Sequence, residues 1–383
     1  MFCRRLFLVL LISNIFCFDF IAQTDSLSVA NGFKYEASYI GDNVGNLSGG
    51  IKTGYGYLGM ANLRLLFNTH NAGWWRGTQF YVNAANTHGT EPSATMIGDM
   101  QVASNIEAGN HTYIQEVWLK QSFNHFELTA GLQDLNMEFA ASEYGSIFMN
   151  SSFGILPIIS ANMPAPIFPL TSPGLTAKFY LNEKTSWLLA IYDGSPTDFD
   201  YNPYNLKWQF ISGDGMLLVT EIQKTTVIKG LEGAYKFGWY SHNHFIEKQF
   251  NPEFPDSLNN SILGVYVYAD QKIWQTGKKC IGAFLQMGYT PSDKCFNNYY
   301  LGMGINYKGI FSKSADDILG LAVGHESLTK DVGEETVIEL SYQRQITPNL
   351  FVQPDLQYII TPSGKSSNLQ NAFVASLRFG LSF

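Results

Sequence analysis

The side chains best suited to bind a solute gather in one long segment, residues 133–172, between two predicted strands. They are carboxylates, amides and a hydroxyl, namely Asp134, Asn136, Glu138, Glu143, Asn150 and Ser151. All of these groups accept hydrogen bonds, and the amides and the hydroxyl also donate them. The set can therefore bind a polar solute through hydrogen bonds.

A second set precedes this segment, where Glu116, Trp118 and Lys120 alternate with Val117 and Leu119. Successive side chains of a strand point to opposite faces. If the two apolar residues face lipid, the other three face the interior, and the Trp118 ring could stack on an apolar face of a solute. The alternative for Trp118 is an aromatic belt at the lipid boundary.

The same residues form no recognisable catalytic or metal centre. Glu138 and Glu143 are paired as glycoside hydrolysis requires, but every other feature of a soluble glycosidase is missing. A lipid-acting barrel enzyme would need Ser and His on its wall, yet the seven histidines lie mainly in connections and no Gly-x-Ser-x-Gly elbow occurs. His242 and His244 have no further ligands nearby, and no nucleotide-binding motif is present. The sequence thus predicts a protein that is not an enzyme and needs no metal or cofactor.

The elements that position these residues are strands, and the last eleven residues show this best. Apolar side chains alternate there with mostly small or polar ones, in the series Phe373, Ala375, Leu377, Phe379, Leu381 and Phe383. The residues between them are Val374, Ser376, Arg378, Gly380 and Ser382. The terminal Phe383 resembles the signature by which bacterial barrel proteins are recognised for membrane assembly.

Sixteen strands are predicted, centred near residues 36, 60, 81, 117, 128, 178, 190, 217, 234, 266, 285, 303, 321, 340, 355 and 378. Short connections are expected near 68–77, 121–125, 182–186, 222–227, 275–279, 312–316 and 347–349. Longer or more polar ones are expected near 42–53, 87–111, 133–172, 193–213, 241–260, 290–297, 326–334 and 362–370. This alternation is typical of outer-membrane β-barrels, which have short periplasmic turns and longer outer loops.

The N-terminus predicts export. Arg4 and Arg5 precede an apolar run, and Ala22 is followed by polar residues, so residues 1–22 are expected to be a signal peptide. A membrane anchor would need a longer apolar run, and bulky Phe16 argues against lipid attachment at Cys17. The formal net charge is −8, or −9 without residues 1–22. This acidic balance argues against nucleic acid as a partner.

Segment 133–172 is too apolar and too proline-rich for a simple linker, and it must be buried somewhere. We expect it to fold into the barrel and narrow the pore; the alternative is packing over the outer mouth. Five further residues share the lumen phase of their strands and could be wall partners or solute contacts, namely Arg64, Glu221, Asp355, Gln357 and Arg378. Charges on the lipid face would cost a few kcal/mol near mid-membrane.

Several blocks resemble the carbohydrate-selective porin family of the OprB type. The most specific are residues 131–139 (GLQDLNMEF), followed by 142–144 and 150–154, and residues 353–359 (QPDLQYI), followed by Pro362 and Gly364. Shorter matches lie at 73–77, 87–89, 192–196 and 268–271, so the resemblance spans roughly residues 48–383. It implies a sixteen-stranded porin that passes sugars.

Together these observations predict an all-β, transmembrane antiparallel barrel over residues 23–383 in a bacterial outer membrane. The predicted function is passive diffusion of small solutes with a preference for carbohydrates. A non-selective or cation-leaning porin is the alternative, followed by a lipid-acting barrel enzyme and an adhesive barrel. Expected partners are sugars or other small solutes, outer-membrane lipids and the barrel assembly machinery; a homo-oligomer is left open.

Two cysteines of the exported chain test this topology. Cys280 and Cys295 flank one predicted strand and should lie at its opposite ends, roughly 25–30 Å apart. A disulfide needs Cα atoms within about 7 Å. We therefore expect no bond between them, and preferential labelling of Cys295 by an impermeant thiol reagent if that residue is exposed.

Overall fold

The fold is taken from a computed structural model, which describes residues 32–208, 210, 215–245, 259–291, 295–312, 315–328 and 333–383. The predicted signal peptide, residues 1–22, lies outside these ranges. No helix among the described residues is long and apolar enough to cross a membrane.

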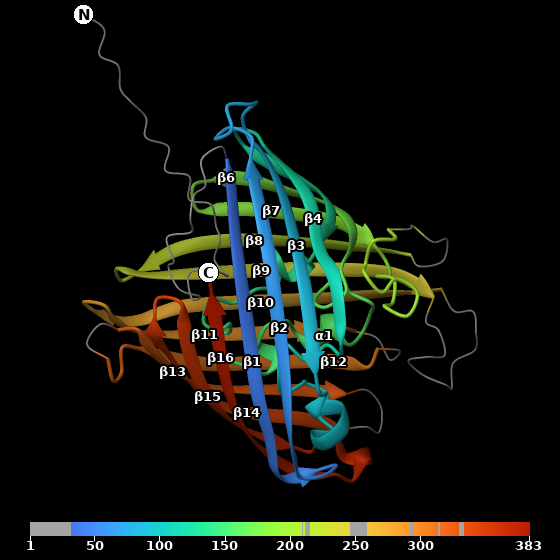
Figure 1. The fold of residues 1–383 in the computed structure, drawn as a ribbon, viewed down its shortest axis with the longest axis vertical. Helices are drawn as coiled ribbons and strands as arrows, with labels where there is room; N and C mark the ends of the chain where they lie inside the picture. Colours follow the sequence, from blue (N-terminus) through green and yellow to red (C-terminus); the bar gives the residue numbers. More distant parts are fainter. Residues whose placement is uncertain are drawn as a thin grey trace, which may run out of the picture.

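Sixteen antiparallel strands close into one barrel in which each strand pairs with its neighbours in sequence and β1 pairs with β16 (Figure 1). The strands are β1 (Phe33–Gly50), β2 (Gly54–Asn68), β3 (Thr78–Gly89), β4 (His111–Ser122), β5 (Phe126–Gln133), β6 (Ser172–Asn182), β7 (Thr185–Asp193), β8 (Met216–Ile228), β9 (Leu231–Phe245), β10 (Asn259–Thr276), β11 (Lys279–Tyr289), β12 (Asn297–Lys308), β13 (Asp317–Leu328), β14 (Glu334–Thr347), β15 (Leu350–Ile360) and β16 (Gln370–Ser382). Every strand contains its predicted centre, so the predicted fold class is confirmed.

Two predicted connections are wrong. Residues 42–53 were expected to form a long loop, but β1 continues to Gly50 because its polar residues Asp42 and Asn46 point inward and the strand stays paired with β2 and β16. Residues 222–227 were expected to form a turn, but they belong to β8, whose turn to β9 follows Ile228. Polar residues were misleading in both cases because a barrel interior accepts them inside strands.

The alternation along β16 separates an outer from an inner face. In the isolated chain Leu377 is 46% exposed and its neighbour Arg378 is 6% exposed. The exposed phase of the strands carries large apolar residues such as Leu63 and Phe237, as a lipid-facing surface requires. Phe383 ends the chain next to β1, where its backbone exchanges two hydrogen bonds with Ala37, of 2.8 and 3.0 Å.

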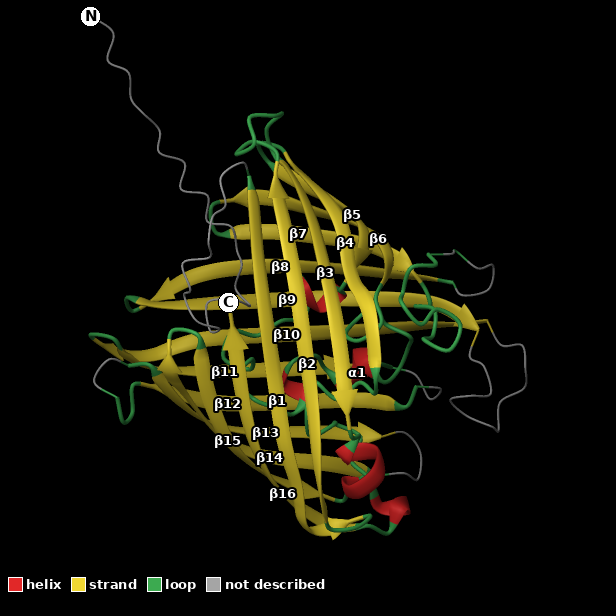
Figure 2. Cartoon of the chain, in the orientation of Figure 1, coloured by secondary structure: helices red, strands yellow, loops and turns green. Residues whose placement is uncertain are grey.

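The connection between β5 and β6, residues 134–171, packs against the inner phase of the strands. It contains η2 (Leu135–Met137), η3 (Ser151–Phe153) and α1 (Pro157–Ser160), drawn among the red helices of Figure 2. Its apolar residues Leu156 and Ile158 share a buried cluster with wall tyrosines from β9, β10 and β12. Phe148 and Phe153 share a second cluster with Phe284 of β11.

Hydrogen bonds fix this segment to strands on widely separated parts of the wall. Lys236 of β9 donates to the Ala141 carbonyl (2.7 Å), and Asn306 of β12 donates to the Tyr144 carbonyl (2.6 Å). Gln353 of β15 donates to the Ile147 carbonyl (2.7 Å). Small wall residues make room for it, since a Cβ added at Gly288 would lie 2.3 Å from the Ile158 side chain.

The cysteines lie where the topology prediction puts them. Cys280 is at the start of β11, while Cys295 follows the end of that strand. Both are recorded without a disulfide. Cys295 is buried, with 2% of its surface exposed, so the condition for its preferential labelling is not met.

Candidate functional site

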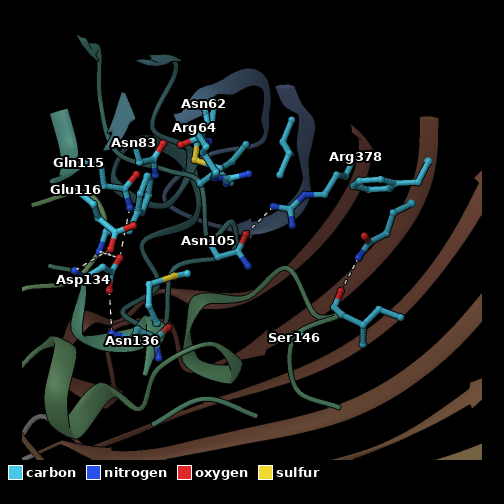
Figure 3. A pocket seen from close by; sticks show the side chains of 18 of the residues that line it. Asn62, Arg64, Asn83, Asn105, Gln115, Glu116, Asp134, Asn136, Ser146 and Arg378 are labelled. Atoms are coloured by element: carbon cyan, nitrogen blue, oxygen red, sulfur yellow. Dashed lines mark hydrogen bonds between the residues drawn. The ribbon is translucent and has the colours of Figure 1, made fainter. Parts of the chain in front are cut away.

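One cavity is lined by strands on either side of the β1–β16 pairing and by the two connections that pack inside the barrel. Its wall comes from β1–β4 on one side and β14–β16 on the other. Segment 90–110, between β3 and β4, contributes Asn105 and Ile106, and segment 134–171 contributes residues including Asp134, Asn136 and Ser146. Figure 3 shows Asp134 and Glu116 on one side of the view, Arg378 on the other, and Asn105 between them.

A polar row crosses the first four strands at one level. Glu36, Arg64, Asn83 and Glu116 are successive cross-strand partners on β1, β2, β3 and β4. The Arg64 guanidinium donates to the Glu36 carboxylate at 2.6 Å. The row therefore presents a cation, an amide and an anion in sequence along the cavity wall.

A second row crosses the seam where the barrel closes. Arg378 of β16 pairs in register with Asp42 of β1 and Gln353 of β15. It makes two 2.7 Å hydrogen bonds to the buried Asp42 carboxylate and a third, also 2.7 Å, to the side-chain oxygen of Asn105. Gln343 extends the row by donating to Gln353 at 3.0 Å.

Acceptors concentrate where β4 meets segment 134–171. The Asp134 carboxylate caps η2 by accepting from the Asn136 amide (2.9 Å), and it accepts from the Phe168 amide (3.1 Å). Glu116 accepts from the Trp118 indole at 3.2 Å. Burial raises the pKa of Asp134 to about 6, although its hydrogen bonds oppose the rise. This side of the cavity thus carries carboxyl oxygens across from the Arg378 guanidinium, while Arg64 lies in the same row of the wall as Glu116.

Glu138 ties the same segment to the wall through charge. Its carboxylate lies 3.1 Å from the Lys120 ammonium and 3.5 Å from that of Lys178. Burial alone would raise the pKa of Glu138, but the two ammonium groups lower it to about 2. Lys120 also lies over the Trp118 ring, which stacks on Tyr81 with centroids 4.7 Å apart. Trp118 therefore backs Tyr81, and it is Tyr81 that lines the cavity.

The structure brings five of the fourteen candidate residues to this cavity, namely Arg64, Glu116, Asp134, Asn136 and Arg378. Glu138, Lys120 and Trp118 do not line the cavity. They contact one another, and Trp118 stacks on the lining residue Tyr81. Glu221 accepts from the Ala140 amide, and Gln357 donates to the Ala103 carbonyl and to Asp355. Asn150 and Ser151 begin η3, with Asn150 capping it, and Glu143 lies in the turn before Ser146.

Sequence reasoning missed several cavity residues, chiefly Asn62, Tyr81, Asn83, Asn105, Gln115, Gln343 and Gln353. Asn62 shares the phase of Arg64 and could have been found by that signal. Gln115 could not, because strict alternation places it outside. An irregularity between the Asn83–Glu116 and Ala84–Ile114 pairs turns both Gln115 and Glu116 inward.

Within the described ranges no three His, Cys, Asp or Glu side chains are arranged to hold a metal ion. The chemistry available is hydrogen bonding by guanidinium, amide and carboxyl groups beside a tyrosine ring.

Comparison with known proteins agrees with this arrangement. The model of the carbohydrate-selective porin, OprB family, matches residues 52–383. Porin B of Pseudomonas aeruginosa is 23% identical, over 91% of this chain and 87% of its own length. The high-pH structure of OprB from Pseudomonas putida superposes with a TM-score of 0.83 at 20% identity, covering 92% of this chain and 94% of that one. OmpF of Salmonella typhi has a TM-score of 0.58 at 9% identity, covering 92% and 98%.

The family match spans most of the chain, and the curated relative aligns over nearly its whole length. The closed sixteen-stranded barrel is the fold of the similar solved structures. This chain therefore belongs to the OprB family of carbohydrate-selective porins, and it is a pore of the bacterial outer membrane and not an enzyme.

Proposed function

We propose that sugars cross this porin through the cavity described above, and that segments 90–110 and 134–171 together form its constriction. The observation that carries the proposal is the opposition of Arg378 to Glu116 and Asp134 across the cavity, with Asn105 between them and Arg64 in the same row of the wall as Glu116. A sugar hydroxyl both donates and accepts, so it can bridge the two sides. A simple ion is attracted by one side and repelled by the other.

The hydrogen bonds between the two segments support a shared role. The Asn105 amide donates to the Met149 carbonyl at 2.7 Å, and the Ser151 amide donates to the Val102 carbonyl at 2.9 Å. Segment 134–171 packs on β8–β15 and reaches β4 through Asp134 and Glu138, and the cavity lies between the segment and β1–β3. A solute would then pass between the segment and the polar rows.

The other candidate residues have supporting roles in this proposal. Lys120 and Glu138 hold segment 134–171 in place, as do Glu221, Glu143, Asn150 and Ser151. Asp355 and Gln357 support the wall under segment 90–110. Residues 1–22 serve as the export signal. The barrel assembly machinery recognises Phe383 and its strand. The apolar outer face contacts outer-membrane lipids.

Liposome swelling tests the sugar path. Glu116→Gln keeps the shape of the side chain but replaces the carboxyl group by an amide, so swelling with monosaccharides should slow relative to swelling with neutral amino acids. Glu232→Gln is the matched control, because Glu232 is an exposed partner of Lys272 outside the cavity. Equal sugar preference in the wild type and the Glu116→Gln variant would refute the proposed contact.

A cation-leaning pore is the second candidate, favoured by the net charge of −9 that remains without residues 1–22. Reversal potentials across a salt gradient separate the two proposals. A sugar path with balanced charges predicts weak ion selectivity, whereas strong cation selectivity that survives Glu116→Gln would favour the general pore.

A further inference from the structure

Away from the sugar path, four carboxyl groups gather where segment 90–110 meets the wall. Asp99 and Glu107 come from the segment, Glu326 from β13 and Glu335 from β14. Glu326 and Glu335 are direct cross-strand partners, and both are fully buried. Like charges directly opposite each other on a sheet destabilise it.

Glu335 acts as a clamp. Its carboxylate accepts hydrogen bonds from the backbone amides of Met100 (2.9 Å) and Gln101 (2.9 Å), and from that of Ser363 (2.8 Å). Ser363 belongs to the connection between β15 and β16, so this one side chain holds two connections against β14. A negatively charged acceptor makes such bonds stronger.

Glu326 and Asp99 differ from Glu335 in their hydrogen bonding. Neither carboxyl group has a hydrogen-bond partner among the described residues, although Glu326 is fully buried and Asp99 is 7% exposed. The Asn297 side chain lies beside Glu326, and Ser93 lies beside Asp99, both short of hydrogen-bond geometry. Buried charges normally shed their charge when no partner is present.

Among the residues that the structure describes, the groups that face this cluster from the neighbouring elements are neutral. Tyr300 of β12 is the cross-strand partner of Glu326, Gln101 lies close to Tyr300 beside Gly324, and Ser93 donates its amide to Glu107. In the described part of the chain, the largest electrostatic effects on the four acids come from burial, from the other acids and from neutral hydrogen-bond donors. Protons are therefore the available means of relieving the repulsion.

We propose that this acid cluster is a proton-dependent latch: protons within the cluster relieve the repulsion among Asp99, Glu326 and Glu335 and let Glu335 hold segment 90–110 against the wall, and their loss releases it. The inference rests on the proposed role of segment 90–110 at the channel. Ser104 donates to Asp42 at 2.7 Å and Asn105 accepts from Arg378, so release of residues 99–101 also loosens the contacts that line the path.

The direction of the pH effect follows from the loop acids. Burial raises the pKa of Asp99 to about 6, and burial followed by the charge of Asp99 raises the pKa of Glu107 to about 7. Groups with a raised folded-state pKa stabilise the latched form fully below their ordinary values, near 4, and lose that contribution as the pH rises through 6 to 7. The latch therefore weakens as the pH rises through 6 to 7 and is weakest above neutrality.

Hydrogen exchange of the full-length protein in lipid tests the latch directly. After correction for intrinsic rates, protection of the Met100, Gln101 and Ser363 amides should fall between pH 6 and pH 8. The closed-to-open ratio should change by at most about tenfold per pH unit for each proton released. Protection that does not vary with pH in the wild type would overturn the proposal.

Three variants separate the roles of the acids. Glu326→Gln and Asp99→Asn remove charges that make no hydrogen bonds, so protection should persist at pH 8. Glu335→Gln removes the charged acceptor, so protection should fall at both pH values. Glu91→Gln is the matched control, because Glu91 is exposed on the same segment, and it should behave as the wild type.

The remaining outcomes are also decisive. If Glu326→Gln and Asp99→Asn both follow the wild-type pH dependence, the cluster is not the latch. If Ca²⁺ restores protection of the wild type at pH 8, a cation and not a proton compensates the charges, and the proposal is overturned. If protection changes with pH while single-channel conductance stays constant, the latch stands and the proposed role of segment 90–110 at the channel fails.

Discussion

Breaking the Asp42–Arg378 pair should destabilise the closure of the barrel between β1 and β16. Both side chains are almost fully buried and are joined by two 2.7 Å hydrogen bonds. Asp42→Asn leaves the guanidinium without its counter-charge, and Arg378→Met leaves the carboxylate without its own. Removing one partner of a buried pair costs about 3–5 kcal/mol.

The double variant distinguishes this mechanism from simple loss of packing. Replacing both charges by groups of similar volume is often close to neutral, so Asp42→Asn/Arg378→Met should be less destabilised than either single variant. Arg378→Met also loses the hydrogen bond to Asn105, which adds about 1 kcal/mol to its loss of stability. Because each single variant leaves one buried charge unpaired and the double variant leaves neither, the two single effects should not add.

Urea unfolding in lipid vesicles, followed by tryptophan fluorescence, measures these free energies. Arg76→Met is the matched control, since Arg76 is exposed in the connection between β2 and β3, and it should stay within about 0.5 kcal/mol of the wild type. Losses below about 1 kcal/mol in both single variants, or a double variant as unstable as their sum, would refute the reasoning.

Three further predictions follow from other contacts. Deleting part of residues 148–169 should raise single-channel conductance and lower sugar discrimination, because these residues pack inside the barrel; unchanged conductance in a folded variant would contradict a constriction there. Removing Phe383, or Phe383→Asp, should reduce the amount of protein in the outer membrane more than the conductance of each inserted channel; normal levels would show that the terminal residue is incidental. The lowered pKa of Glu138 contributes stability above its ordinary value of 4.5 that is lost as the pH falls toward 2, so unfolding free energies between pH 5 and pH 2 should decline less in Glu138→Gln than in the wild type. Parallel declines would exclude the Lys120–Glu138–Lys178 contacts as the source.

The sequence by itself was sufficient for the barrel. A period of two is a local property, because each strand must expose one face to lipid, and the pattern in residues 373–383 can be read without knowing any partner. All sixteen strand centres followed from it. The inward phase of Arg64, Glu116 and Arg378 followed in the same way, since a charge on the lipid face is costly.

The pattern failed where a polar residue could belong either to a loop or to the lumen. Residues 42–53 were misassigned for this reason, because Asp42 is inside a strand only by virtue of Arg378, 336 residues away. Local composition carries no trace of such a partner. Gln115 was missed for a related reason, since the irregularity that turns it inward arises from pairing with β3.

Only the tertiary structure decided which candidate residues share one site. Sequence phase placed Glu221, Asp355 and Arg378 in the lumen alike, but segment 134–171 covers Glu221, while Arg378 stays at the cavity. The acid cluster of Asp99, Glu326 and Glu335 was likewise invisible, since it joins a connection to strands more than 220 residues later. Strand periodicity is set by the solvent on each side of the wall, whereas these groupings are set by how two long connections fill the closed interior.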